Sequence, residues 1–171
     1  MSKHLNLRDF QTKLSLRIQE STARPSVNSF LAVQAGNQNW LIGLTDISEV
    51  IAPLPWVPVP FTKSWFLGVT NIRGRLYTVV DLSAYAKLGE TRTDPNNRLL
   101  LTHPHFSTQV ALLVDQTLGL RNIDSMQATQ SPTASNWAGN CYLDGDNQIW
   151  QQIDLASLIS RDDFLTISST H

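Results

Sequence analysis

The sequence contains the same order of short segments twice, and this internal repeat limits the possible folds more than any other feature. The stretch NIRGRLYTVVDLSAYA at residues 71–86 aligns without gaps with DGDNQIWQQIDLASLI at residues 144–159. Upstream, FLAVQAGNQNWLIGLTDI at residues 30–47 aligns with LLLTHPHFSTQVALLVDQ at residues 99–116. An ordered internal repeat of this kind indicates that each half of the chain folds into the same supersecondary unit.

Each half is a series of short apolar runs separated by turn residues. The runs SFLAVQ, NWLIGL, LYTVVDL, NRLLLT and TQVALLVD are rich in valine, leucine and aromatic residues, and glycine, asparagine, proline or aspartate separates them. Short strands at this density are typical of an all-β barrel or sandwich. The segment AGNQN at residues 35–39 predicts a hairpin turn. The segment TDISEVI at residues 45–51 is interpreted as a helical turn or an irregular bend.

Prolines and aspartates mark the ends of these strands. Residues 53–61, PLPWVPVPF, cannot form a central strand because their four prolines lack the N–H groups of a sheet ladder. We expect an extended connector over the barrel, with Trp56 and Phe61 covering apolar surface. Asp81 and Asp154 end the aligned strands, and a short apolar segment follows each. We interpret both as N-caps of short helices, which accept hydrogen bonds from free backbone N–H groups, rather than as catalytic acids.

The beginning of the chain has a different pattern from the β-rich body. Leu7, Phe10, Leu14 and Ile18 recur at helical spacing, which predicts an amphipathic helix. This helix either packs on its own domain or docks on a partner. We therefore divide the chain into a helical extension and linker at residues 1–26, a body with two repeated subdomains at 27–165, and a tail at 166–171.

Composition narrows the functional classes. The 171 residues carry a net charge of −1 and only 16% charged residues, without the basic stripe of a nucleic-acid-binding protein. The single cysteine, Cys141, excludes an intrachain disulfide and is interpreted as a buried thiol. The N-terminus lacks the apolar core of a secretory signal, and no apolar run is long enough to span a membrane. These features predict a soluble, cytoplasmic protein without membrane insertion.

No residue pattern predicts catalysis, a cofactor or a metal. His103 and His105 flank Pro104, but no nearby cysteine or carboxylate cluster completes a metal site around them. The sequence has no Gly-rich phosphate loop and no GxSxG nucleophile turn. DGDN at residues 144–147 lacks the spaced ligands of a calcium loop and is interpreted as a hairpin turn. We therefore expect a protein that is not an enzyme. The alternative is a β-barrel that binds a small ligand, or an enzyme, outside signalling.

The turn at residues 71–74, NIRG, places an arginine between two apolar strands. Gly74 permits a positive φ angle, so a tight hairpin would hold Arg73 away from the barrel. The guanidinium carries five donors in a planar fork. Two interpretations remain open: Arg73 binds a carboxylate of another protein, or it pairs with an acid of its own chain, such as Asp46 or Glu49. The aligned DGDN turn of the second half has no arginine.

These motifs resemble those of the CheW-like domain family. FLGVTNIRGRLYTVVDL matches its Gly-Val-x-Asn-[Leu/Ile]-Arg-Gly turn and the following Val-Asp-Leu strand, and NWLIGLTDISEVI and VALLVDQTLGL resemble other family segments. The resemblance covers about residues 28–160 and implies two intertwined five-stranded SH3-like barrels. It also implies a non-catalytic adaptor that links a CheA-type histidine kinase to methyl-accepting chemoreceptors in membrane-associated arrays. YLDGDNQIWQQIDLASLI is most similar to PilI-type adaptors, which belong to the chemosensory systems of type IV pili and twitching motility.

The resemblance further implies which residues contact these partners. Asn71, Ile72, Arg73 and Gly74 occupy the family's turn, where Arg73 would lie near the receptor-binding surface or support it from below. A groove between the barrels is the expected receptor site. The candidates for its lining are apolar residues of both halves: Ile47, Val50, Ile51 and Leu120. The kinase is expected to contact one end of a barrel.

Overall fold

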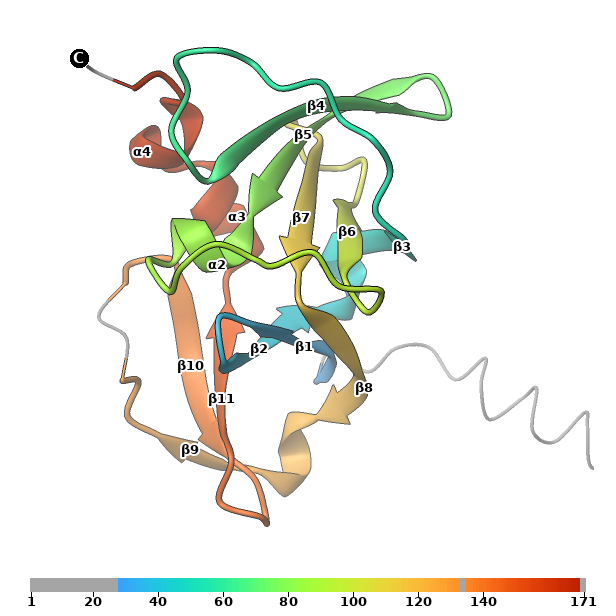
Figure 1. Ribbon diagram of the computed structural model, residues 1–171. Helices are drawn as coiled ribbons and strands as arrows, with labels where there is room; N and C mark the ends of the chain where they lie inside the picture. The colour runs from blue at the N-terminus through green and yellow to red at the C-terminus, as the bar shows by residue number, and fades with distance from the viewer. Residues whose placement is uncertain (1–27, 133–134, 170–171) are drawn as a thin grey trace, which may run out of the picture.

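Strands dominate the part of the chain that the computed structural model describes, residues 28–132 and 135–169 (Figure 1). The first half contains β1 (Ser29–Ala35), β2 (Gln38–Gly43), β3 (Ile47–Ile51), β4 (Phe66–Ile72), β5 (Arg75–Asp81) and helix α2 (Leu82–Tyr85). The second half contains β6 (Arg98–Thr102), β7 (Val110–Val114), β8 (Gln116–Asn122), β9 (Gln127–Thr129), β10 (Ala138–Leu143), β11 (Ile149–Ile153), α3 (Leu155–Ile159) and α4 (Asp162–Leu165). The 3-10 turns η1 (Leu44–Asp46) and η2 (Ile123–Ser125) precede β3 and β9. The predicted N-terminal helix lies outside the described residues.

The two sheets exchange strands between the halves of the sequence. Sheet A has the order β8-β1-β2-β11-β10-β9, and sheet B has the order β3-β6-β7-β5-β4. The first hairpin of each half therefore lies in the sheet that later strands of the other half complete. The halves meet in equivalent parallel pairings, β11 with β2 and β5 with β7. This exchange confirms the prediction of a mainly β protein with two intertwined barrel units; β9 adds a sixth strand to sheet A.

The predicted turn and helix caps agree with the structure. Gly36 and Asn37 form the β1–β2 turn with φ angles of 61° and 60°, the pair of positive angles that a type I′ hairpin requires. Asp81 and Asp154 accept hydrogen bonds from backbone N–H groups in the first turns of α2 and α3, at 3.3 and 3.0 Å. Both carboxylates therefore cap the helix that follows their strand, as the sequence predicts.

One local prediction was wrong in part and another was wrong. Residues 45–51 were expected to form a helical turn or an irregular bend; residues 45 and 46 do belong to the 3-10 turn η1, but residues 47–51 form β3, which pairs antiparallel with the distant strand β6. Phe61 was expected to cover apolar surface, but it is 72% exposed. The connector backbone turns at Phe61 with a φ of 60°, and the Phe61 carbonyl accepts a hydrogen bond from Ser169 N–H at 2.9 Å. Trp56 of the same connector does pack against a buried cluster, as expected.

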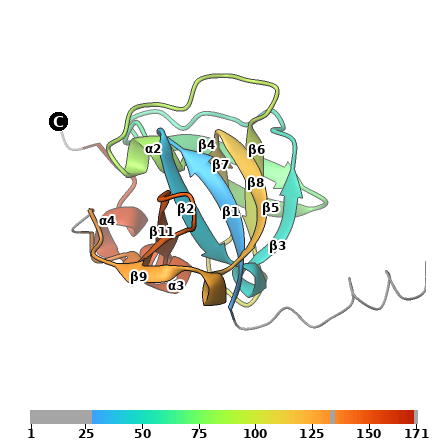
Figure 2. The same cartoon turned by 90° about the horizontal axis from the view of Figure 1, so that it is seen from below.

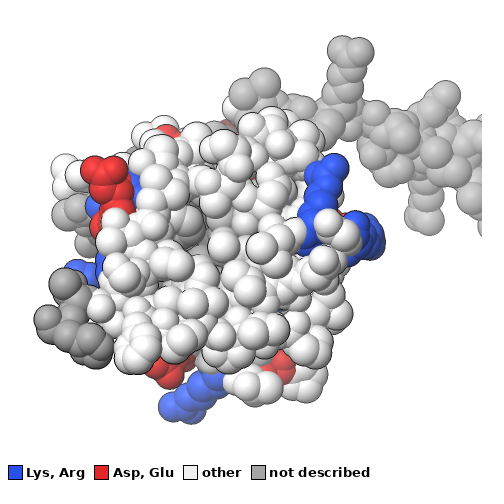
Figure 3. Space-filling view, turned by 90° about the horizontal axis from the view of Figure 1, so that it is seen from above, with Lys and Arg blue, Asp and Glu red and all other residues white. Residues whose placement is uncertain are grey.

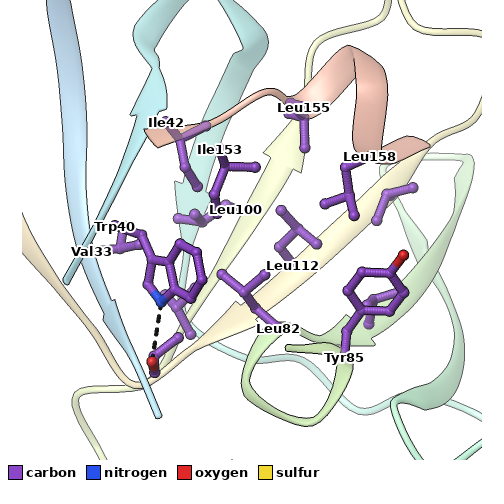
Figure 4. Close-up of a cluster of buried hydrophobic side chains, with 14 of the residues drawn as sticks. Val33, Trp40, Ile42, Leu82, Tyr85, Leu100, Leu112, Ile153, Leu155 and Leu158 are labelled. Carbon is purple, nitrogen blue, oxygen red and sulfur yellow. Dashed lines mark hydrogen bonds between the residues drawn. The ribbon is translucent and has the colours of Figure 1, made fainter. Parts of the chain in front are cut away.

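Buried side chains alternate between the space between the sheets and the inside of each barrel, because successive residues of a strand point to opposite faces. Trp40 and Leu100 belong to the large cluster between the sheets, together with residues of α2 and α3 (Figure 4). Their neighbours Leu41 and Leu99 belong to the smaller clusters of sheets A and B. The Trp40 indole donates to the carbonyl of Ala35 at 3.1 Å, which satisfies its only polar atom. The described helices are all too short or too polar to cross a membrane.

Candidate partner-binding surface

The NIRG turn is a tight hairpin whose backbone is fixed by its own residues. Arg73 and Gly74 have φ angles of 53° and 82°, so both central residues occupy the left-handed region. The Asn71 side-chain oxygen accepts a hydrogen bond from Gly74 N–H at 2.9 Å. A non-glycine residue in this region is strained, and the Asn71 hydrogen bond holds the turn in place. The predicted positive φ of Gly74 is confirmed, and Arg73 shares it.

Arg73 forms a two-pronged ion pair with Glu49 of β3. Its Nη1 and Nη2 atoms lie 2.6 and 2.7 Å from the two carboxylate oxygens, and these hydrogen bonds raise the pKa of the guanidinium. The strands β3 and β4 are the opposite edges of sheet B, so this pair joins the two edges at one end. The intrachain alternative is therefore the observed one, with Glu49 as the partner. The Arg73 side chain remains 74% exposed while it is paired.

Asp46, the other acid considered for Arg73, instead lies beside the loop between β6 and β7. His105 Nε2 is 3.9 Å from its carboxylate, and His103 N–H donates to its carbonyl at 2.8 Å. Burial raises the pKa of Asp46. Within residues 28–132 and 135–169, no group of three or more His, Cys, Asp or Glu residues is arranged to hold a metal ion. The contacts of Asp46 with His103 and His105 connect the turn before β3 to the other half of the chain.

In the second half of the chain, a hairpin turn and an edge strand are also connected through charged side chains, but the acid and the base have changed places. Asp144, in the DGDN turn between β10 and β11, accepts a hydrogen bond from the Trp150 indole at 2.8 Å. Arg121 of β8 lies over the Trp150 ring, 5.0 Å from its centroid. The Trp150 hydrogen bond is the main reason why the pKa of Asp144 lies below its usual range, and Arg121 lowers it further. Here the turn contributes the acid and the edge strand contributes the base.

The remaining candidate residues differ in how much they are exposed. Ile72 is 7% exposed and packs inside barrel B, so it supports the turn rather than presenting a surface. Ile47 and Ile51 on β3 are half-buried; Ile47 packs against the large cluster between the sheets, and Ile51 packs against the cluster of sheet B. Val50 points outward and is 39% exposed, and Leu120 on β8 is 65% exposed. Figures 1 and 2 place β3 and β8 on the side of the molecule away from α2 and α4.

The connector between β3 and β4 forms an exposed apolar patch that the sequence prediction missed. We call Leu54, Val57, Val59 and Phe61 the connector patch; their exposures are 40, 67, 37 and 72%. Residues 50–62 contain no charged side chain, and Figure 3 shows charges mainly at the rim of the face that the connector crosses. Exposed large apolar side chains that gather on one uncharged segment are typical of interaction sites. The signal in the sequence was the uncharged run PLPWVPVPF, which was interpreted as a cover.

The single cysteine lies inside the fold, as predicted. Cys141 on β10 is 2% exposed, and burial raises the pKa of its thiol. A thiol that is neutral and shielded from solvent is a poor nucleophile. Cys141 therefore serves as packing in sheet A.

The exchanged sheets and the joined edges define an intertwined, two-sheet β protein with exposed apolar edges. The model of the CheW-like domain matches residues 29–163. The chain belongs to the CheW-like domain family. This membership confirms the resemblance that the NIRG turn and the Val-Asp-Leu strand carry in the sequence.

Relatives in several bacteria share this domain. Protein FrzA of Myxococcus xanthus is 31% identical over 121 residues, which cover 71% of this chain and 74% of FrzA. The chemotaxis protein CheW of Rhizobium meliloti (strain 1021) is 27% identical over 103 residues, covering 60% of this chain and 65% of that protein. Protein PilI of Pseudomonas aeruginosa is 28% identical over 96 residues, covering 55% of this chain and 52% of PilI. The chain thus aligns with about half to three quarters of these relatives.

A solved structure has the same fold. The scaffolding protein TtCheW from Thermoanaerobacter tengcongensis superposes with a TM-score of 0.68 at 17% sequence identity. The superposition covers 79% of this chain and 94% of that protein. At this identity the similarity concerns the fold, and it agrees with the strand exchange described above.

Proposed function

We propose that the chain is a non-catalytic coupling adaptor that links a CheA-type histidine kinase to methyl-accepting chemoreceptors. The observation that carries this proposal is the presence of exposed apolar side chains on both sheets of a CheW-like fold. Leu120 is exposed on β8 of sheet A, whereas Val57 is exposed where the connector pairs with β4 of sheet B. An adaptor needs separate surfaces of this kind, because it holds two partners at once.

The chemoreceptor would bind at the side formed by β3, β8 and the NIRG turn. Val50 and Leu120 supply its exposed apolar contacts, and Asn71, Arg73 and Gly74 supply its polar rim. Ile47, Ile51 and Ile72 act from below, since their side chains are half-buried or buried. Arginine and large apolar side chains usually carry most of the free energy of an interface. The kinase would then bind the connector patch, which lies at one end of barrel B (Figure 1).

The similarity to PilI supports a more specific role in the control of type IV pili and twitching motility. The chain would act in the cytoplasm at membrane-associated receptor arrays. Within this proposal, residues 1–26 are an extension, residues 27–165 are the adaptor domain, and residues 166–171 are a tail. The adaptor would contribute geometry and no chemistry: it would hold receptor and kinase at a fixed spacing, so that a shift of the receptor changes kinase activity.

The Arg73–Glu49 pair offers a sharp test of receptor binding. Arg73→Glu is expected to weaken binding to a purified chemoreceptor cytoplasmic fragment about tenfold, and Val50→Lys or Leu120→Lys should act similarly. The melting temperature should hardly change, because exposed ion pairs contribute about 1 kcal/mol or less. The control is the exchanged variant Glu49→Arg/Arg73→Glu, which restores the ion pair but removes the arginine from the turn. If Arg73→Glu bound normally, or if the double variant Glu49→Arg/Arg73→Glu restored binding in full, the only role of Arg73 would be to join the two edges of sheet B through its ion pair.

The partners themselves can be identified by affinity capture from the native host followed by mass spectrometry. Recovery of a CheA-like kinase together with a chemoreceptor is the expected result. Recovery of neither protein, with a small molecule bound instead, would replace the adaptor by a ligand-binding β-barrel.

A further inference from the structure

A cavity of about 660 Å³ opens where the two halves of the chain meet, on the side of α2 and α4. The segments that precede β4 and β10 form two of its walls. These segments are equivalent in the repeat: the carbonyl of Trp65 accepts from Asp81 N–H at 2.8 Å, and that of Trp137 accepts from Asp154 N–H at 3.0 Å. Figures 1 and 2 place this side of the molecule away from β3 and β8.

The floor of the cavity is aromatic and fixed. The Tyr85 ring lies between the two tryptophans, with its centroid 5.2 Å from that of Trp65 and 5.7 Å from that of Trp137. Phe164 packs against both Trp65 and Tyr85, with its centroid 5.5 Å from that of Trp65 and 5.3 Å from that of Tyr85. All four rings are at most 9% exposed. Trp65, Tyr85 and Trp137 line the cavity and Phe164 supports them from below, so the small exposed part of these packed rings forms a rigid aromatic floor.

The walls of the same cavity are basic, although the chain as a whole is not. Beyond residue 13 the sequence contains only two lysines, Lys63 and Lys87, and both line this cavity. Arg161 also lines it, but its guanidinium pairs with Asp163 at 2.7 and 3.0 Å. This pair neutralises the one carboxylate in the lining, and it lowers the pKa of Asp163.

Among the residues that the structure describes, neither lysine has a carboxylate partner. None of the ion pairs within residues 28–132 and 135–169 includes Lys63 or Lys87. The Lys63 ammonium donates to the backbone carbonyl of Asp163 at 3.3 Å and lies 5.8 Å from the centroid of the Trp65 ring. It is therefore held at the cavity wall. The cavity thus combines an aromatic floor with two ammonium groups that no carboxylate of the described residues neutralises.

We propose that this cavity binds an acidic segment of a protein partner, in which carboxylate side chains alternate with apolar ones. Carboxylates would meet the ammonium groups of Lys63 and Lys87, and an adjacent apolar side chain would rest on the ring of Tyr85. Complementary charge accelerates encounter and selects the partner. The site lies away from β3 and β8, so it can be occupied together with them, and it does not depend on the adaptor role proposed above.

The test uses the full chain and a short synthetic peptide that alternates glutamate and leucine. Isothermal titration should show saturable binding that weakens as salt is raised, because salt screens exposed charges. Lys63→Gln and Lys87→Gln should each lower the affinity about fivefold. Arg92→Gln removes one exposed positive charge outside the cavity and should leave the affinity unchanged. A matching peptide with glutamine in place of glutamate should not bind.

Three results would overturn the proposal. The first is the absence of saturable binding by the acidic peptide. The second is equal loss of affinity in Arg92→Gln and the two lysine variants, which would reduce the effect to net charge. The third is displacement of the peptide by inorganic phosphate at equal concentration, which would make the cavity a site for small anions. Thermal unfolding of each variant confirms that the fold is retained.

Discussion

Asp81 and Asp154 occupy equivalent positions in the repeat, but their surroundings differ. Asp154 is an exposed N-cap of α3. Asp81 is 2% exposed and, besides capping α2, accepts hydrogen bonds from the N–H and hydroxyl groups of Thr91, both at 2.8 Å. It thereby fastens the loop after α2 to the end of β5. Loss of the buried Asp81 hydrogen bonds is expected to destabilise the fold far more than loss of the exposed Asp154 cap.

Substitution of each aspartate distinguishes the stability contributed by the helix cap from that contributed by the hydrogen bonds between Asp81 and Thr91. Asp81→Ala is expected to lower the free energy of unfolding by about 3 kcal/mol, because the cap is lost and the half-buried Thr91 loses the carboxylate that accepts from its N–H and hydroxyl groups. Asp154→Ala, the matched control, should cost about 1 kcal/mol. Denaturant titration followed by tryptophan fluorescence measures both values. Equal losses for the two variants would contradict the role assigned to the Thr91 hydrogen bonds.

At the scale of elements, one glycine determines how the connector lies on β4. Val57 and Val69 exchange backbone hydrogen bonds of 2.8 and 3.0 Å, so the connector adds a short bridge to the edge of sheet B. Gly68, the neighbour of Val69, has a φ of +145°, and a Cβ atom there would lie 2.2 Å from the carbonyl oxygen of Val57. The glycine of the GVTNIRG segment is thus required by close backbone approach, and through it the connector patch is held in place.

Gly68→Ala tests this requirement. The added methyl group forces the connector away from β4 and strains the backbone, so a loss of about 3 kcal/mol is expected. Gly145→Ala is the matched control, since a Cβ atom there meets nothing within 4 Å, and its effect should stay within about 0.5 kcal/mol. Chemical denaturation gives both values. If Gly68→Ala were as stable as the parent protein, the connector would not depend on the bridge to β4.

At the scale of the whole molecule, the exchange of strands makes the two barrels one folding unit. Each sheet needs strands from both halves, and the large buried cluster includes Trp40 from the first half and Leu158 from the second. Neither half can complete its sheet alone. A displacement on the side of β3 and β8 and a contact at the connector patch would therefore be connected through a shared core.

Thiol labelling can show whether the sheets unfold together. Cys141 reports on sheet A, and Ala111→Cys in a Cys141→Ala background reports on sheet B, since Ala111 is fully buried on β7. Each thiol should become reactive at the same denaturant concentration at which its own variant loses tryptophan fluorescence, as expected of a cooperative transition. Labelling of one thiol well before the fluorescence change would show that its sheet opens separately.

The candidate surface was only partly predictable from the sequence. The NIRG turn could be recognised because Asn71 and Gly74 act through local hydrogen bonds and backbone angles. The partner of Arg73 could not be chosen, because Asp46 and Glu49 are close in sequence. Only in the folded chain does Asp46 lie beside His105 and Glu49 beside Arg73. The connector patch was missed because an apolar residue in a proline-rich run gives no sign of the face it presents. The cavity with Lys63 and Lys87 joins segments far apart in the chain.

Elements with local causes could be predicted before the fold was known: the hairpin at Gly36, the helix caps at Asp81 and Asp154, and the repeat that makes the halves alike. Periodicity, turn angles and capping depend on neighbouring residues, so they can be read without a fold. That residues 47–51 form a strand, and that the hairpins exchange sheets, became apparent in the folded chain. Those outcomes depend on hydrogen bonds between distant strands, such as β3 with β6, whose partners become known only when the chain is folded.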